Sequence, residues 1–197
     1  MNNKRYGGYI IAAVLSILVL YAIVTYNGLV KKEELVKKQW NEVNSAYQRR
    51  IDLIPSLVNV VKGQADFEQT VLQQLTAARA KASSTTAGSG EISSDNFNKQ
   101  AAAQNDLANA ASRLLITVEK YPTLKGTEAF AGLQTQLEGT ERRIKVARKD
   151  FNAAIADYNS AVKSFPVNIV GALFGFKAKE GFASDAGADK STDIKFN

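Results

Sequence analysis

The side chains best suited to chemistry are three carboxylates, Asp52, Glu138 and Glu141. Glu138 and Glu141 are three residues apart, which places both on one face of a helix, and Asp52 could face them from another helix. Paired carboxylates can act as general acid and base in a hydrolysis. The arginines that could neutralise them are Arg49, Arg50, Arg142 and Arg143. We favour neutralisation and predict a structural ion-pair cluster of Arg49, Arg50, Asp52, Glu138, Glu141 and Arg142, with Asp52 in salt-bridging reach of an arginine.

The composition argues against most other catalytic chemistry. The chain has no His and no Cys, and its one Met is Met1. Thiol nucleophiles, imidazole bases, and the usual ligands of zinc, di-iron and haem sites are therefore missing. No strand pattern is present, so a phosphate-binding loop between a strand and a helix is not expected. We predict no catalytic residue, no metal site, no cofactor and no small-molecule substrate.

A long helix must position Glu138 and Glu141. Apolar or small residues recur at alternating steps of three and four, the pattern of a helix with one buried face. They are Phe130, Leu133, Leu137, Thr140, Ile144, Ala147, Phe151, Ala154, Tyr158, Ala161 and Phe165. At 1.5 Å per residue this helix would be roughly 54 Å long, and it needs partner helices along its length.

The segment 29–82 supplies the first partners and contains Asp52. Its apolar face is formed by Val36, Trp40, Val43, Tyr47, Ile51, Ile54, Val58, Val61 and Ala65. Pro55 predicts a kink, and Gly63 lowers helix propensity. We divide the segment into one helix to about Lys62 and another from about Gln64 to Ala82. One long bent helix remains the alternative.

A third partner follows a loop that is rich in Ser, Thr and Gly and covers residues 82–90. Asp95 is a candidate N-cap, and Tyr121-Pro122 stops the helix. Its repeating face is Phe97, Ala101, Gln104, Ala108, Ala111, Leu115 and Val118. Four helices joined by short connections predict an all-α fold, an antiparallel up-and-down four-helix bundle over residues 28–176.

Before the bundle, the segment from Tyr6 to Tyr26 carries no charge. Its length matches the ~20 residues that cross a bilayer, and Tyr6, Tyr9 and Tyr26 mark its ends as interfacial rings do. A cleaved signal peptide is the alternative, but the apolar region is too long and no small-residue cleavage site follows. We predict a short tail (1–5) and a single-pass transmembrane anchor (6–27), with the lipid bilayer as a partner.

Four lysines follow the span directly: Lys31, Lys32, Lys37 and Lys38. Such residues can attract anionic headgroups or can simply face water. Lys4 and Arg5 precede the span, so the positive-inside rule favours a cytoplasmic bundle. The net charge of +6 is weak evidence for nucleic acid, because acidic residues stand beside the basic ones, and none is predicted as a partner.

After Pro166, which ends the long helix, comes a short apolar run, residues 167–176. Something must cover it: the end of its own bundle, the membrane interface or a neighbouring copy. In an up-and-down bundle this run returns to the end nearest the anchor. We predict a short helix or turn there, with Leu173, Phe174 and Phe176 as contacts to lipid headgroups or another subunit. Residues 177–197 are interpreted as a disordered tail.

Several stretches resemble the LemA family of bacterial membrane proteins. They are Asn27-Gly-Leu-Val30, Trp40-Asn-Glu-Val43, Arg49-Arg50-x-Asp52-Leu-Ile-Pro55-x-Leu57-Val58, Leu137-Glu-Gly-Thr-Glu141-Arg-Arg-Ile144-x-Val146-Ala-Arg-x-Asp150-Phe151, Tyr158-Asn159 and Ser164-Phe-Pro166-x-Asn168. The resemblance covers the chain from the anchor to about Phe176. It implies an N-terminal anchor followed by a helical bundle in the bacterial inner membrane, and it implies no reaction.

Together these observations predict a non-enzymatic scaffold or interaction module at the bacterial envelope that self-associates into a homo-oligomer; a membrane protein is a further candidate partner. The alternative is an adaptor that regulates a membrane enzyme, such as a protease. The mass of the extracted assembly would separate the two hypotheses.

Overall fold

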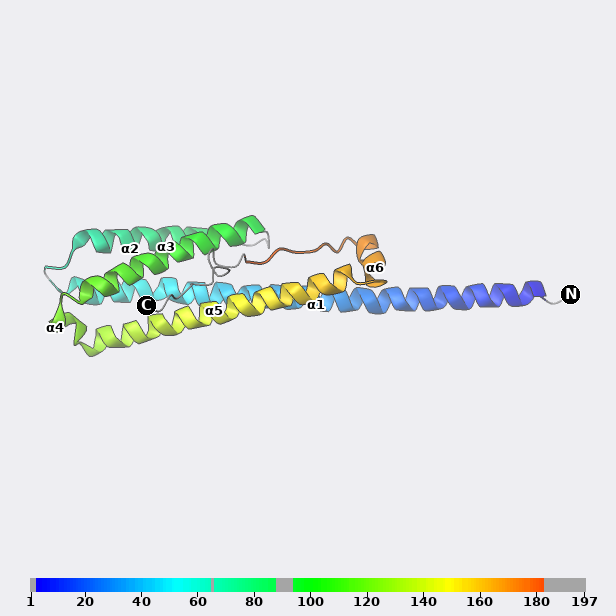
Figure 1. Ribbon diagram of the computed structural model, residues 1–197, viewed down its shortest axis with the longest axis horizontal. Coiled ribbons are helices and arrows are strands. Elements are labelled where there is room, and N and C mark those ends of the chain that lie inside the picture. Colours follow the sequence, from blue (N-terminus) through cyan, green and yellow to red (C-terminus); the bar gives the residue numbers. More distant parts are fainter. Residues whose placement is uncertain (1–2, 65, 88–93, 183–197) are drawn as a thin grey trace, which may run out of the picture.

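A computed structural model describes residues 3–64, 66–87 and 94–182 of the chain (Figure 1). These residues form helices and no strand, so the predicted all-α fold is confirmed. The helices are α1 (Asn3–Lys62), α2 (Gln69–Ala87), α3 (Ser94–Val118), α4 (Pro122–Lys125), α5 (Glu128–Lys163) and α6 (Val167–Leu173).

The bundle is formed by α2, α3, α5 and the second half of α1. The closest pairs are α1 with α5 and α2 with α3, and successive long helices run in opposite directions (Figure 1). The first half of α1 projects far beyond the other helices. Since α1 contains 60 residues, it is about 90 Å long. Anchor and bundle therefore share one continuous helix, with no linker at residue 27.

The core has two parts. The part far from the anchor is mainly aliphatic and centres on Ile54, Leu75, Leu107 and Leu114, all fully buried. The part near the anchor is aromatic: the rings of Trp40, Phe97, Phe151 and Phe182 lie with their centroids 4.6 to 5.9 Å apart. Such ring contacts add to the free energy gained by removing these large side chains from water.

The long helix predicted from Phe130 is α5. Thr127 caps it by accepting a hydrogen bond from the Phe130 amide at 3.3 Å, and Glu128 and Lys163 suit the helix dipole at its two ends. The predicted apolar face is buried from Phe130 to Tyr158, with Leu133 partly exposed. The prediction is wrong for Phe165, which is 80% exposed because α5 ends two residues earlier.

The segment 29–82 forms two helices and not one. α1 stays helical across Pro55 and ends at Lys62, and α2 begins at Gln69, later than predicted. The residues between them turn, and Phe67 is buried against the core there. Ala65, predicted to lie on the apolar face, is outside the described residues.

Two further predictions need correction. Asp95 is not an N-cap, because α3 already begins at Ser94 and Asp95 lies in its first turn. Residues 177–182, predicted to be disordered, form an extended segment that packs along α5, which we call the strap. The rest of the predicted tail, residues 183–197, is outside the described residues.

Candidate membrane-interface site

The free part of α1 has the properties of a membrane span. It is the one described helix that is long and apolar enough to cross a bilayer, and the apolar stretch is not buried in the protein. Tyr9 is 74% exposed and Tyr26 is 40% exposed. The side chain of Tyr6 is outside the described residues. The hydrophobic side chains on this segment have no protein cover, so lipid is the environment that suits them.

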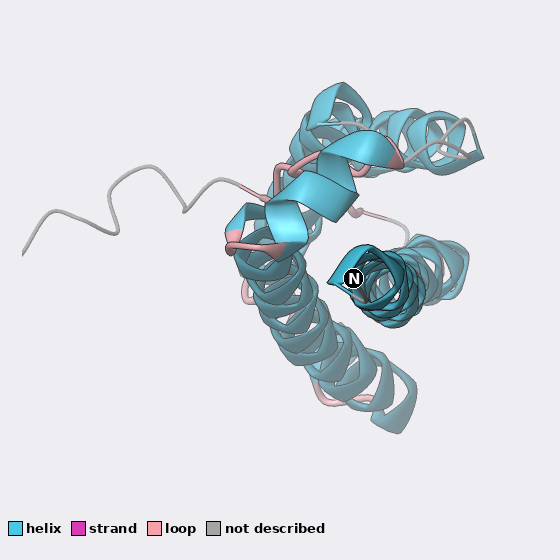
Figure 2. Ribbon diagram, turned by 90° about the vertical axis from the view of Figure 1, so that its right-hand side faces the viewer, coloured by secondary structure: helices cyan, strands magenta, loops and turns pink. Residues whose placement is uncertain are grey.

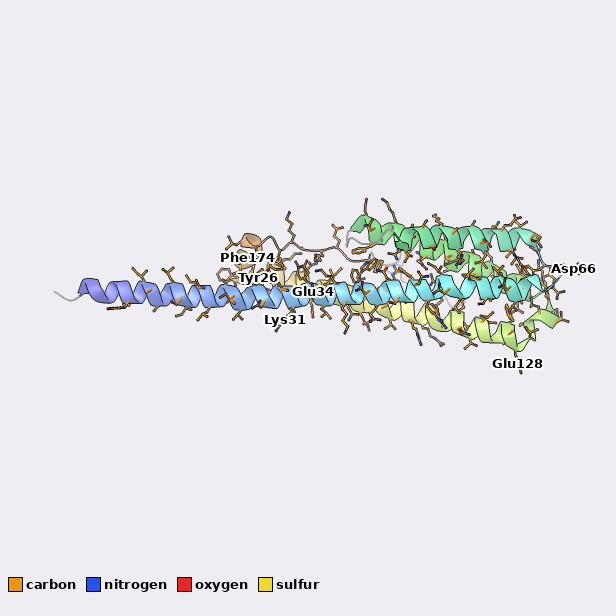
Figure 3. All side chains as sticks on the ribbon, turned by 180° about the vertical axis from the view of Figure 1, so that it is seen from behind. Tyr26, Lys31, Glu34, Asp66, Glu128 and Phe174 are labelled. Carbon is orange, nitrogen blue, oxygen red and sulfur yellow. The ribbon has the colours of Figure 1, made fainter. Side chains whose placement is uncertain are left out.

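Helix α6 lies across the end of the bundle from which the anchor emerges, as Figure 2 shows from the anchor side. Val170 is buried, and a Cβ added at Gly171 would lie 3.7 Å from Leu29 Cδ1, so α6 touches α1 closely at this point. The ring of Tyr26 lies edge-on to Phe174 at 5.0 Å and to Phe176 at 5.6 Å. Figure 3 shows Tyr26 and Phe174 close together where the anchor leaves the bundle.

The outer face of α6 is apolar and uncovered. Leu173 is 78% exposed, Ile169 61% and Phe174 51%, and the nearby Phe165 is 80% exposed. Of the three residues predicted to make contacts here, Leu173 and Phe174 are thus left open by their own bundle, whereas Phe176 is half-buried against Tyr26. We call Phe165, Ile169, Leu173 and Phe174 the apolar collar.

The four lysines after the span differ in their surroundings. Lys37 is paired with Glu34 at 2.7 Å, and this hydrogen bond raises the pKa of Lys37. Lys31, Lys32 and Lys38 have no ion pair within the described part of the chain. Lys31 lies about a turn beyond Tyr26, at the same end of the bundle as Phe174 (Figure 3). These charges can therefore reach the headgroup region if the collar contacts the bilayer.

The predicted ion-pair cluster is reduced to one pair in the core. Arg50 is only 3% exposed and forms a salt bridge with Glu141 of α5. Its second nitrogen donates to the backbone oxygen of Gln104 at 2.9 Å and to the Gln104 side chain at 3.2 Å. Burial lowers the pKa of Arg50, and the Glu141 carboxylate opposes that shift. Arg50 thus joins α1, α3 and α5 through one charged layer.

The other predicted members do not join this layer. Asp52 is exposed and accepts a hydrogen bond from Gln48 at 2.8 Å, so the predicted salt bridge with an arginine is not formed. Two residues turn a helix by about 200°, so Asp52 faces away from Arg50. Arg49 donates to Gln136 at 3.2 Å.

The two remaining predicted members of the cluster, Glu138 and Arg142 of α5, also form no salt bridge among the described residues. Glu138 accepts from Gln134 at 3.0 Å on its own helix, and Arg142 is exposed without an ion pair among the described residues. The three carboxylates that could have formed an acid–base pair therefore have separate partners: Asp52 bonds to Gln48, Glu138 to Gln134 and Glu141 to Arg50. Within the described residues, no group of three or more His, Cys, Asp or Glu side chains could hold a metal ion.

The strap is the feature that sequence reasoning missed. Asn159 of α5 holds the backbone of Lys179, accepting from its amide at 2.8 Å and donating to its carbonyl at 2.7 Å. Asn152 holds Phe182 in the same way, at 2.9 and 3.2 Å. The ring of Phe182 enters the aromatic core, and Lys179 pairs with Glu33 of α1 at 2.9 Å. A Cβ at Gly181 would lie 2.5 Å from Asn152 Oδ1, so a larger residue there would displace the Asn152 side chain that holds Phe182.

One signal could have revealed the strap. Asn152 and Asn159 are seven residues apart, which places two amide side chains on one face of α5 at a spacing of two turns. An amide can donate to and accept from the backbone of one residue at the same time.

Comparison with known proteins gives a family and named relatives. Residues 39–196 match the sequence model of the LemA family. The magnetosome proteins MamQ 1 and MamQ 2 of Paramagnetospirillum magneticum are each 27% identical over 199 residues, covering 91% of this chain and 73% of theirs. The magnetosome protein MamQ of Magnetospirillum gryphiswaldense is 28% identical over 198 residues, covering 89% of this chain and 72% of its own.

Proposed function

The chain belongs to the LemA family, and from this we propose that it is a membrane-anchored scaffold that self-associates at the bacterial envelope and catalyses no reaction. The observation that carries the proposal is where the exposed apolar side chains lie. In the described residues they cover the free part of α1 and the adjoining collar, whereas the bundle surface has few, among them Ile116 and Val146. This distribution suits a protein whose anchor lies in a membrane and whose polar bundle lies in the water beside it.

In this proposal α6 lies in the membrane interface. The collar continues the apolar surface of the anchor at the level of Tyr26, and Lys31 and Lys32 stand where headgroups would begin. Aromatic and aliphatic side chains flanked by lysines are the usual composition of such an interfacial segment. The bundle is placed on the cytoplasmic side, because four lysines follow the span and two basic residues precede it.

Self-association has a candidate surface within the anchor. Gly8, Ala12 and Ser16 are four residues apart and form one narrow face of α1. Nothing lies within 4 Å of a Cβ added at Gly8, and the Ser16 hydroxyl donates to the Ala12 carbonyl at 2.9 Å. Small residues in this arrangement let two membrane helices approach closely.

A structural role also agrees with what the relatives are called. The MamQ proteins are named for the magnetosome and not for a reaction. Asp52, Glu138 and Glu141 each bond to a different side chain, so none of them is assigned a catalytic part.

We expect the collar to bind membranes even without the anchor. In a protein lacking residues 1–26, replacing Phe165, Ile169 and Leu173 by Ser should weaken binding to vesicles of anionic lipids. Burying one such side chain contributes about 1.5–3 kcal/mol, so partial burial of three predicts a loss of roughly a hundredfold in partitioning. Because all three are exposed, the midpoint of thermal unfolding should hardly change. Vesicle sedimentation and calorimetry measure the two quantities.

The matched control replaces Ile116 and Val146, which are 68% and 57% exposed and lie on the bundle. This control should bind vesicles like the parent protein. Equal binding by all three proteins would show that α6 is only part of the bundle surface.

A further inference from the structure

A groove on the side of the bundle collects positive charge. It has a volume of about 500 Å³ and lies between α3 and α5, with residues of α1 at its base. Its cations are Arg142, Lys145, Arg148 and Lys149. None of them forms an ion pair in the described part of the chain. The one carboxylate in the lining, Glu141, is already paired with Arg50, so the four cations are uncompensated.

Two buried donors at the base of the groove lack partners. The Tyr47 hydroxyl and the Arg50 Nε are buried without a hydrogen bond, and both residues line the groove. Burial raises the pKa of Tyr47, and the nearby positive charges of Arg148 and Arg50 oppose that rise. The hydroxyl therefore keeps its proton at neutral pH and can donate it. Buried donors without acceptors, below a cluster of cations, suit a ligand that is negatively charged and offers oxygen acceptors.

The number of cations indicates which kind of anion fits. A phosphate group carries a charge of about −1.5 to −2 at neutral pH, whereas a carboxylate carries a single negative charge. Two phosphate groups in one compact ligand would therefore balance the four cations. Two of these cations are arginines, Arg142 and Arg148, whose planar guanidinium groups can each bind two phosphate oxygens.

The groove is too far from the proposed membrane interface for lipid headgroups to fill it. Tyr47 lies 21 residues beyond Tyr26 on the same continuous helix, which is about 30 Å along the helix axis. In the proposed arrangement Tyr26 lies in the interface. The charge of the membrane surface is screened over about 8 Å at physiological salt, so it has little effect at the groove. A soluble ligand is the source that suits this position.

We propose that this groove binds a soluble anion with two or more phosphate groups. The four cations bind its phosphate oxygens, and the Tyr47 hydroxyl and the Arg50 Nε donate to it at the base. Asn105 of α3 lines the opposite wall, so the ligand joins α3 to α5. The anion is bound and not transformed, because Glu141 is the one carboxylate in the lining and Arg50 holds it.

Titration calorimetry with inorganic pyrophosphate tests the proposal on the full chain in lipid nanodiscs. We expect one site per chain. The test variant, Lys145→Gln with Arg148→Gln, should weaken binding at least tenfold, because it removes two charged donors from the groove. The matched control, Arg113→Gln with Arg143→Gln, removes the same charge at exposed positions that do not line the groove. Its affinity should stay within about twofold of the parent, because distant charges are screened.

Tyr47→Phe separates binding from folding, because it removes only the hydroxyl. Pyrophosphate should bind about fivefold more weakly, the usual effect of one lost hydrogen bond. The midpoint of thermal unfolding without pyrophosphate should stay the same or rise, because a buried polar atom without a partner is removed. Unchanged binding together with a lower midpoint would show that Tyr47 serves the core alone, and it would overturn the proposed site.

Four other results would also overturn the proposal. Two are the absence of binding to the parent protein and equal losses in the two double variants, which would show a response to net charge only. Nanodiscs of phosphatidylcholine and of phosphatidylglycerol should give the same affinity, and loss of binding in the second would assign the groove to headgroups. Tighter binding of an oligoglutamate peptide than of pyrophosphate would assign it to an acidic segment of a partner protein.

Discussion

Deletion of residues 1–26 is expected to release the protein from the membrane fraction once the membranes are washed with carbonate. The uncharged part of α1 is long enough to span the hydrocarbon core, and its side chains are exposed in the structure. A spanning helix is inserted almost irreversibly, whereas the collar alone gives reversible binding. Carbonate washing followed by sedimentation should therefore leave the full chain in the pellet and the shortened chain in the supernatant.

A chain shortened at its other end, by residues 183–197, is the control and should stay in the pellet. Full-length protein in the supernatant after the wash would refute the anchor. If the chain lacking residues 1–26 stayed in the pellet, the collar or another protein would be holding it at the membrane.

Removal of the Glu141 carboxylate should lower the free energy of unfolding by about 2 kcal/mol. Breaking a fully buried ion pair costs about 3–5 kcal/mol, and the expected value here is smaller because water reaches half-exposed Glu141. Arg50 would be left charged in the core, with Gln104 as its remaining partner. Urea unfolding of the protein lacking residues 1–26 measures the change for Glu141→Ala.

Glu138→Ala is the matched control, since Glu138 lies one turn earlier on α5 and bonds only to Gln134. Its effect should stay within about 0.5 kcal/mol. Arg50→Met should cost less than Glu141→Ala, because it removes the buried charge itself, and adding Glu141→Ala to it should then change little. Similar effects of Glu141→Ala and Glu138→Ala would show that the ion pair does not hold α1 and α5 together.

The helices could be predicted because their periodic pattern is dense. The residues of α5 from Phe130 to Tyr158 recur at helical steps, and burial follows the same steps. The pattern does not mark where a helix ends, so it places Phe165 on a buried face although α5 stops at Lys163. The position of α6 near the anchor could also be predicted. In an up-and-down bundle of four helices, the last helix ends where the first begins.

The candidate sites were harder to predict, for two physical reasons. Neighbours in sequence need not be neighbours on a helix, so Arg50 points into the core while Asp52 points to water. The strap has no local pattern of its own: its order comes from Asn152, Asn159 and the aromatic core, which are far away in sequence. The small and charged residues of the strap are typical of disordered segments, so their composition predicts disorder.

The mass of the protein extracted from membranes, measured in a mild detergent by native mass spectrometry, tests the proposed scaffold most directly. One chain has a mass of 21.4 kDa, so a self-associating scaffold predicts a multiple of that value with no second protein. A single chain, or a complex with a fixed number of copies of another membrane protein, would contradict the scaffold, and the second result would identify an adaptor.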